Sequence, residues 1–109
     1  MHYRSAIARD SNRTSVLVDL GVCYYNLSHA DDAERLFRLA LVRDPHQPVA
    51  LFNLGIVYER RSELEKALQY YHHALESGPP EEIKQPIIEA MQRVLKQTGK
   101  VAPPLPDAR

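Results

Sequence analysis

An internal period of 34 residues constrains this sequence more than any other feature. Residues 20–24 read Leu-Gly-Val-Cys-Tyr, and residues 54–58, which follow them by 34 positions, read Leu-Gly-Ile-Val-Tyr. The same offset relates five further pairs: Ala33 and Ala67, Phe37 and Tyr71, Ala40 and Ala74, Leu41 and Leu75, Pro45 and Pro79. A fixed period of this length predicts similar units that stack on one another.

The first full repeat, residues 14–47, is predicted to contain two helices. Its first helix, for which Asn12 is a plausible cap, has apolar residues at three- and four-residue steps, the spacing of one helical face. The predicted buried stripe consists of Val16, Leu17, Leu20, Cys23, Tyr24 and Leu27. Residues 28–31 have the S-x-x-D spacing of a capping box for the second helix. That helix buries Ala33, Leu36, Phe37, Ala40 and Leu41, and it ends at Asp44 because Pro45 follows.

The second repeat, residues 48–81, follows the same plan. Pro48 is tolerated in a first helical turn, and residues 62–65 have the S-x-x-E spacing of a second capping box. The predicted stripe of its first helix is Leu51, Leu54, Val57 and Tyr58, and that of its second helix is Leu64, Ala67, Leu68, Tyr71, Ala74 and Leu75. Residues 77–80, Ser-Gly-Pro-Pro, end this repeat.

Residues outside the two repeats are expected to continue the helical plan in part. Residues 1–12 match the end of a repeat in type, so we predict a lone second helix over residues 2–10. Residues 82–99 are predicted to form a C-terminal capping helix over about residues 86–98, with residues 81–85 as a turn because Pro86 disfavours a helix interior. Residues 100–109 are predicted to be an extended, proline-rich tail.

The repeat resembles the tetratricopeptide family, whose pattern over 34 residues is a large apolar residue, L-G-x2-Y, A-x3-F-x2-A and a proline. In the first repeat those positions are Leu17, Leu20, Gly21, Tyr24, Ala33, Phe37, Ala40 and Pro45. In the second repeat they are Leu51, Leu54, Gly55, Tyr58, Ala67, Tyr71, Ala74 and Pro79. Leucine replaces the frequent tryptophan in both repeats, and Tyr71 replaces phenylalanine. The resemblance implies an all-α solenoid of antiparallel helix pairs.

The small and aromatic residues of this pattern have a structural explanation. Glycine inside a helix costs about 1 kcal/mol relative to alanine, so Gly21 and Gly55 need a packing reason. We expect helices to cross closely at both glycines, with alanines facing them and with aromatic rings filling the space around each crossing. The rings are those of Tyr24, Phe37, Tyr58 and Tyr71. Cys23 is expected to be a buried, unreactive thiol.

The resemblance also implies a concave groove lined by the first helix of each repeat, in which family members bind peptides or helices of partner proteins. The groove positions of the first repeat are Val18, Asp19, Val22, Tyr25 and Asn26, and those of the second are Phe52, Asn53, Ile56, Glu59 and Arg60. If the frame continues, the terminal helix adds Ile83, Ile87 and Val94. A family site that grips a C-terminal carboxylate is not expected, because only Asn53 matches it.

The predicted groove is apolar, since Val18, Val22, Phe52 and Ile56 lie on it, and an exposed apolar patch usually marks an interface. Either a partner occupies it or the chain covers it itself. Residues 101–106 could lie in the groove, or two chains could pair through the lone helix at residues 2–10 and the terminal helix. Repeat arrays need capped ends, and this chain has a good cap at one end only.

Composition excludes several functional classes. Lys plus Arg and Asp plus Glu number 14 each, so no basic surplus predicts binding to nucleic acid or to an anionic membrane. No apolar run approaches the roughly 20 residues of a membrane span, and the N-terminal residues lack a signal-peptide core, which favours the cytoplasm. The five histidines do not assemble a predicted metal site, and no base is spaced to activate Cys23. We therefore expect no cofactor and no enzymatic activity.

The functional expectation is a protein–protein interaction module that acts as a scaffold or adaptor. Two alternatives remain open at this point. One is a self-assembly element that forms a homo-oligomer through the groove and the open N-terminal end. The other is a regulatory appendage cut from a larger protein.

Overall fold

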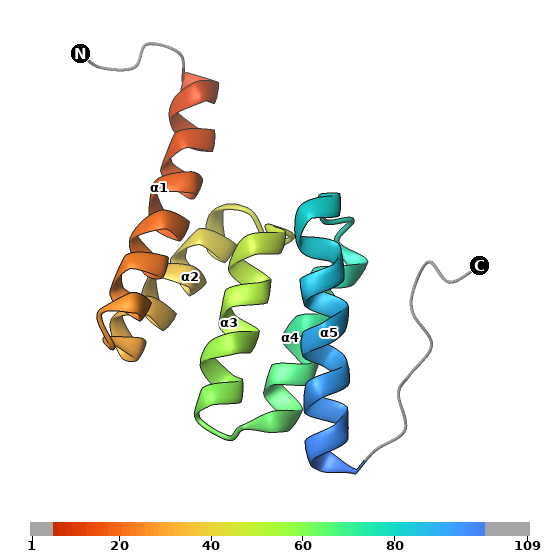
Figure 1. Cartoon of the computed structure of the whole chain (residues 1–109). Coiled ribbons are helices and arrows are strands. Elements are labelled where there is room, and N and C mark those ends of the chain that lie inside the picture. Colours follow the sequence, from red (N-terminus) through yellow and green to blue (C-terminus); the bar gives the residue numbers. More distant parts are fainter. Residues whose placement is uncertain (1–5, 100–109) are drawn as a thin grey trace. The chain divides into compact units, whose positions relative to one another are not determined.

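The computed structural model describes residues 6–99, with side chains from Arg13 onward, and divides into two compact units, Met1–Pro45 and His46–Arg109. Unit 1 contains α1, Ala6–Asn26, and α2, Ala30–Arg43. Unit 2 contains α3, Pro48–Arg60, α4, Leu64–Glu76, and α5, Glu81–Thr98. Within the described range every regular element is a helix, which confirms the predicted all-α repeat architecture (Figure 1).

A glycine-on-ring contact joins the two helices of each hairpin, as the sequence predicts. A Cβ atom added to Gly21 of α1 would lie 2.5 Å from Cε1 of Phe37 in α2. A Cβ atom added to Gly55 of α3 would lie 2.5 Å from Cδ1 of Tyr71 in α4. Both rings are fully buried, and so are the facing alanines Ala33, Ala40, Ala67 and Ala74. The backbone of each first helix therefore packs directly on an aromatic side chain of the second.

The turn inside each hairpin differs from the predicted capping box. The residues before α2 and α4 are His29 and Glu63, and neither makes a side-chain cap hydrogen bond. Ser28 and Ser62 instead adopt left-handed conformations, with φ of 69° and 64°. After Ser62, the Glu63 N–H donates to the Tyr58 carbonyl at 2.9 Å. The serines thus occupy the left-handed position that ends the preceding helix, where glycine is usual.

The N-terminal helix also differs from the prediction. Residues 2–10 were expected to form a separate helix, with Asn12 capping the next one. Residues 2–5 lie outside the described part of the chain, and α1 runs without a break from Ala6 through Asn12 to Asn26. The polar stretch Asp10–Asn12 therefore does not end a helix here.

The terminal helix begins earlier than predicted. Glu81–Gln85 form the first turns of α5, and Pro86 lies inside the helix. The Ile83 and Lys84 N–H groups both donate to the Pro80 carbonyl at 3.1 Å, which closes the first turn. Proline lacks an N–H, so it removes one helical bond, but the carbonyl left without that donor belongs to Glu82, an exposed residue at the first turn of the helix. The predicted tail, residues 100–109, lies outside the described residues.

Unit 2 has a continuous core that α3, α4 and α5 share. Its fully buried large side chains are Leu51, Leu54, Val57, Tyr71, Ile87, Met91 and Val94. At the start of α3, the Gln47 side chain accepts a 2.7 Å hydrogen bond from the Val49 N–H, which caps the helix ahead of Pro48. At the end of α5, Gly99 has φ of 75° and closes the helix in the left-handed region.

Replacing Gly55 by alanine tests the glycine-on-ring contact. At a solvent-exposed position inside a helix, replacing glycine by alanine stabilises the helix by about 1 kcal/mol. Here the new methyl group overlaps the buried ring of Tyr71, so we expect the free energy of unfolding to fall by about 1–3 kcal/mol. This free energy of unfolding is measured by chemical denaturation. The exposed helical residue Gln69 serves as the control, since Gln69→Ala should be close to neutral, and a stabilised Gly55→Ala variant would contradict the packing described.

Replacing Ser62 by glycine tests the left-handed turn. Glycine adopts φ of 64° without the steric cost of a Cβ atom, so Ser62→Gly should raise the free energy of unfolding by about 1 kcal/mol. Ser77 is the matched control, because it has φ of −75° and its hydroxyl donates to the Ala74 carbonyl at 2.7 Å. Ser77→Gly should destabilise. The melting temperatures of both variants are measured by thermal denaturation. Equal shifts in melting temperature for Ser62→Gly and Ser77→Gly would contradict the left-handed turn at Ser62.

Candidate functional site

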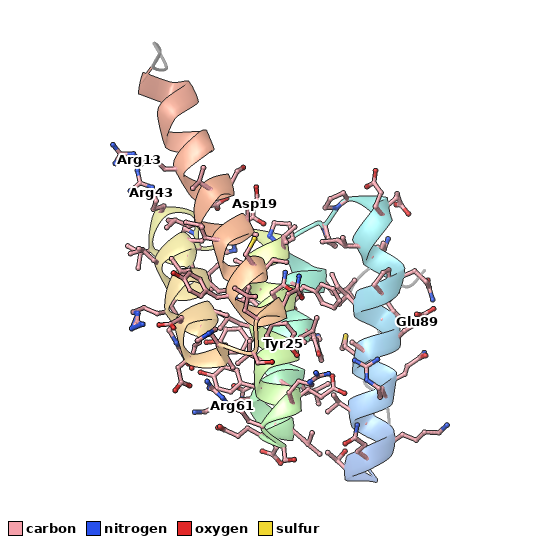
Figure 2. The ribbon with its side chains drawn as sticks, turned by 60° about the vertical axis from the view of Figure 1, so that its left-hand side comes forward. Arg13, Asp19, Tyr25, Arg43, Arg61 and Glu89 are labelled. Atoms are coloured by element: carbon pink, nitrogen blue, oxygen red, sulfur yellow. The ribbon has the colours of Figure 1, made fainter. Side chains whose placement is uncertain are left out.

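The predicted groove positions of unit 1 lie on one side of α1 but differ in exposure. Val18 is 5% exposed, Val22 and Tyr25 are half-buried, and Asp19 and Asn26 are exposed. Figure 2 labels Asp19 and Tyr25 on α1. The apolar members are therefore only partly accessible, and the polar members are the ones that reach solvent.

The predicted groove positions of unit 2 lie along α3. Phe52, Asn53 and Ile56 are half-buried and Arg60 is exposed. The Phe52 ring is tilted against Tyr71 with 5.8 Å between ring centroids, and the Asn53 amide donates to the Val49 carbonyl at 2.8 Å. Phe52 and Ile56 therefore offer a small apolar surface held in place by the core beneath it.

Glu59 belongs to a different kind of site from its predicted neighbours, because it holds unit 2 together. Arg93 of α5 donates to it from Nε at 2.6 Å and from Nη2 at 2.8 Å, and the Tyr71 hydroxyl donates at 2.7 Å. The Arg93 guanidinium is the largest cause that holds the pKa of Glu59 below its ordinary value of 4.5. Burial, together with the Glu59 carboxylate, raises the pKa of Tyr71. The network ties α3 to both α4 and α5.

The residues that the terminal helix was expected to add to the groove lie mostly in the core. Ile87 and Val94 are fully buried and Ile83 is half-buried. The predicted frame failed because α5 begins at Glu81 and packs extensively on α4. Its apolar stripe is therefore used for packing within unit 2.

An exposed apolar surface on unit 1 is the feature that the sequence reading missed. Val16 is 52% exposed, Leu20 43%, Tyr24 39% and Leu27 66%, and Cys23 is also exposed. All five were predicted to be core, but none of them belongs to the core that α1 and α2 form within unit 1. In the second repeat, 34 residues later, the counterparts of Val16, Leu20, Cys23 and Tyr24 are at most 3% exposed. These counterparts are Ala50, Leu54, Val57 and Tyr58. Periodicity identified an apolar side of α1 correctly but not whether anything covers it.

The second helix of unit 1 extends this surface. Leu39 is 48% exposed and Leu36 is half-buried. Figure 2 shows Arg13 of α1 and Arg43 of α2 pointing to the same side of unit 1. Residues seven apart share a side of a helix, so Leu20 lies on the side of Arg13, and Leu36 lies on that of Arg43. We call the resulting surface the open face: Val16, Leu20, Cys23, Tyr24 and Leu27 of α1 with Leu36 and Leu39 of α2.

The open face is nearly free of charge along α1. Between residues 14 and 27 the helix carries one charged side chain, Asp19, which borders the open face because it lies three residues from Val16 and four from Cys23. Charges gather at the two ends of the face instead. Arg13 and Arg43 lie at one end, and Asp32 lies near the beginning of α2 at the other.

Two other kinds of site were sought among the described residues. No group of three or more histidine, cysteine, aspartate or glutamate side chains in residues 13–99 is placed to hold a metal ion. None of the helices in the described part of the chain is both long and apolar enough to cross a membrane.

A protein-family model described as a tetratricopeptide repeat matches residues 18–82, which run from within α1 to the start of α5 and make up more than half of the chain. A comparison with curated proteins found no match.

Glu59→Gln tests the network that joins α3, α4 and α5. The variant should lower the free energy of unfolding at pH 7 by about 1 kcal/mol, a modest value because Arg93 is half-exposed. A carboxyl whose pKa is lowered in the folded state stabilises above its ordinary pKa of 4.5 and loses this effect as the pH falls through the folded value. The stability difference from the wild type should therefore shrink below pH 4.5. Exposed Glu89→Gln is the control, and a pH-independent difference would contradict the assignment.

Proposed function

The chain belongs to the tetratricopeptide repeat family, a non-catalytic family of protein-interaction repeats, and we propose that it binds a peptide or helix of a protein partner along its first helices. The surface concerned is the part of the predicted groove set that lies on α3 of unit 2. The observation that carries the proposal is the pair of half-buried apolar side chains, Phe52 and Ile56, that α3 keeps outside the core.

The exposure pattern of α3 supports this surface. Four side chains of α3 are almost completely buried in the core and are therefore not accessible to a partner: Leu51, Leu54, Val57 and Tyr58. Phe52 and Ile56 are four residues apart and share a side of the helix. Because the core fixes the helix beneath them, a partner would meet them already in position, which lowers the entropic cost of binding.

The chemistry of this surface favours an apolar ligand. Asn53 is the only residue that matches the family's carboxylate-gripping site, and its amide already donates to the Val49 carbonyl. Glu59 is held by Arg93 and Tyr71, so of the two charged groove positions of α3, Arg60 is the one that remains exposed. We infer a ligand with apolar side chains at helical or alternate spacing.

Ile56→Glu tests the proposed surface. A random peptide library is selected on the wild-type chain, and the affinity of each selected peptide is measured by calorimetry. A charge at Ile56 should weaken binding at least about tenfold, which corresponds to about 1.4 kcal/mol. Gln69→Glu adds the same charge at an exposed position of α4 and should leave the affinity unchanged. Both variants must keep the wild-type helix content. Peptides that bind Ile56→Glu as tightly as the wild type would contradict the proposal.

A further inference from the structure

We propose that the ligand of the α3 surface carries an aspartate or glutamate side chain, which Arg93 of α5 binds beside the apolar side chains that contact Phe52 and Ile56. The inference rests on the proposed function and deepens it by naming a chemical feature of the ligand. Arg93 is not one of the groove positions that the sequence resemblance implied. Arg93, Phe52 and Ile56 all belong to unit 2, so the geometry is that of one compact unit.

A series of direct contacts links the apolar surface of α3 to Arg93. Phe52, Ile56 and Glu59 follow one another at four- and three-residue steps, so their side chains lie along one side of α3. The Phe52 ring lies 5.8 Å from the Tyr71 ring between centroids, and the Tyr71 hydroxyl donates to Glu59 at 2.7 Å. Glu59 in turn accepts hydrogen bonds from Arg93. The guanidinium group therefore lies at the end of the apolar stripe, about one turn beyond Ile56.

The ion pair between Glu59 and Arg93 presents hydrogen-bond donors to a ligand. The Arg93 side chain is 53% exposed, whereas the Glu59 side chain is 12% exposed. The Glu59 carboxylate also accepts from the Tyr71 hydroxyl and, at 3.5 Å, from the Gln97 amide. Exposed Arg60 lies four residues after Ile56 and adds a positive charge to the same end of the stripe. A ligand therefore meets positive charge here, even though the ion pair itself is neutral.

Arg93 keeps donors for a second acceptor. A guanidinium group has five N–H donors in a planar fork. Glu59 takes two of them, one from Nε at 2.6 Å and one from Nη2 at 2.8 Å. The donors that Glu59 does not take lie on Nη1 and Nη2, and this edge of the fork matches a carboxylate through two parallel hydrogen bonds. An amide lacks the negative charge that strengthens such bonds, so the geometry favours an acidic side chain.

The contacts within unit 2 also hold Arg93 in position before a ligand arrives. Two hydrogen bonds from the guanidinium group to one carboxylate restrict its orientation, and the Tyr71 hydroxyl restricts the carboxylate. A long side chain that is already ordered loses less conformational entropy on binding than a free one. The arrangement therefore favours binding at Arg93 over binding at an arginine without such contacts.

The spacing on α3 predicts the spacing in the ligand. Phe52 and Ile56 lie about 6 Å apart along the helix axis, and Glu59 lies about 4.5 Å further along. Apolar side chains four residues apart in a helix, or two residues apart in an extended chain, match the first distance. The acidic residue is then expected about one helical turn, or one to two extended residues, beyond the apolar pair.

The peptides selected on the wild-type chain provide the first test. We expect an aspartate or glutamate at a fixed distance from the apolar pair. Replacing that residue in a peptide by its amide should weaken binding to the wild type about fivefold in calorimetry, and the difference should shrink at high salt. Selected peptides that lack such an acidic residue, or that bind equally well as acid and amide, overturn the inference.

A double variant, Glu59→Gln with Arg93→Gln, tests whether Arg93 causes the preference for the acid. Both charges are removed together, so Glu59 is not left as an unpaired carboxylate. The fivefold preference should disappear in the double variant. Lys96→Gln removes a positive charge at an exposed position one turn along α5 and should keep the preference. A preference that persists in the double variant overturns the inference.

Arg93→Lys replaces the double variant if the latter loses helix content. Lysine keeps the positive charge but lacks the planar fork, so the preference should fall to about twofold or less. An unchanged preference in Arg93→Lys overturns the inference. Its failure is distinguishable from failure of the proposed function: peptides that depend on Ile56 but not on an acidic residue contradict this inference alone, whereas peptides that do not depend on Ile56 contradict the proposed function.

Discussion

The contact of a helix backbone with an aromatic ring is the interaction on which both hairpins depend. Gly21 lies on Phe37 and Gly55 lies on Tyr71, and in each case a Cβ atom would overlap the ring. Glycine inside a helix costs about 1 kcal/mol relative to alanine. Complete burial of a phenylalanine-sized side chain contributes about 1.5–3 kcal/mol, so the close approach outweighs the cost of the glycine. The alanines facing each crossing keep the two helices near enough for this balance to hold.

One hydroxyl group makes the two crossings differ. Phe37 ends in the core of unit 1, whereas the Tyr71 hydroxyl reaches Glu59, which also accepts two hydrogen bonds from Arg93. The ring that closes the α3–α4 hairpin thereby also positions the carboxylate that secures α5. In unit 1 the position equivalent to Glu59 is Tyr25, so this network has no counterpart there. The same repeat position thus holds a tyrosine in unit 1 and, in unit 2, the carboxylate that ties α3 to α4 and α5.

The sequence was enough to predict the helices and their crossings, because the spacing of small and large residues is itself the packing rule. It was not enough to predict which apolar sides are covered. Leu20 and Leu54 look alike in the sequence, yet they are 43% and 0% exposed. Local rules also misled at two points. Pro86 is tolerated because the hydrogen bond it removes lies at an exposed turn. The serine–glutamate spacing of residues 62–65 predicted a helix cap, whereas Ser62 adopts the left-handed conformation that ends the preceding helix.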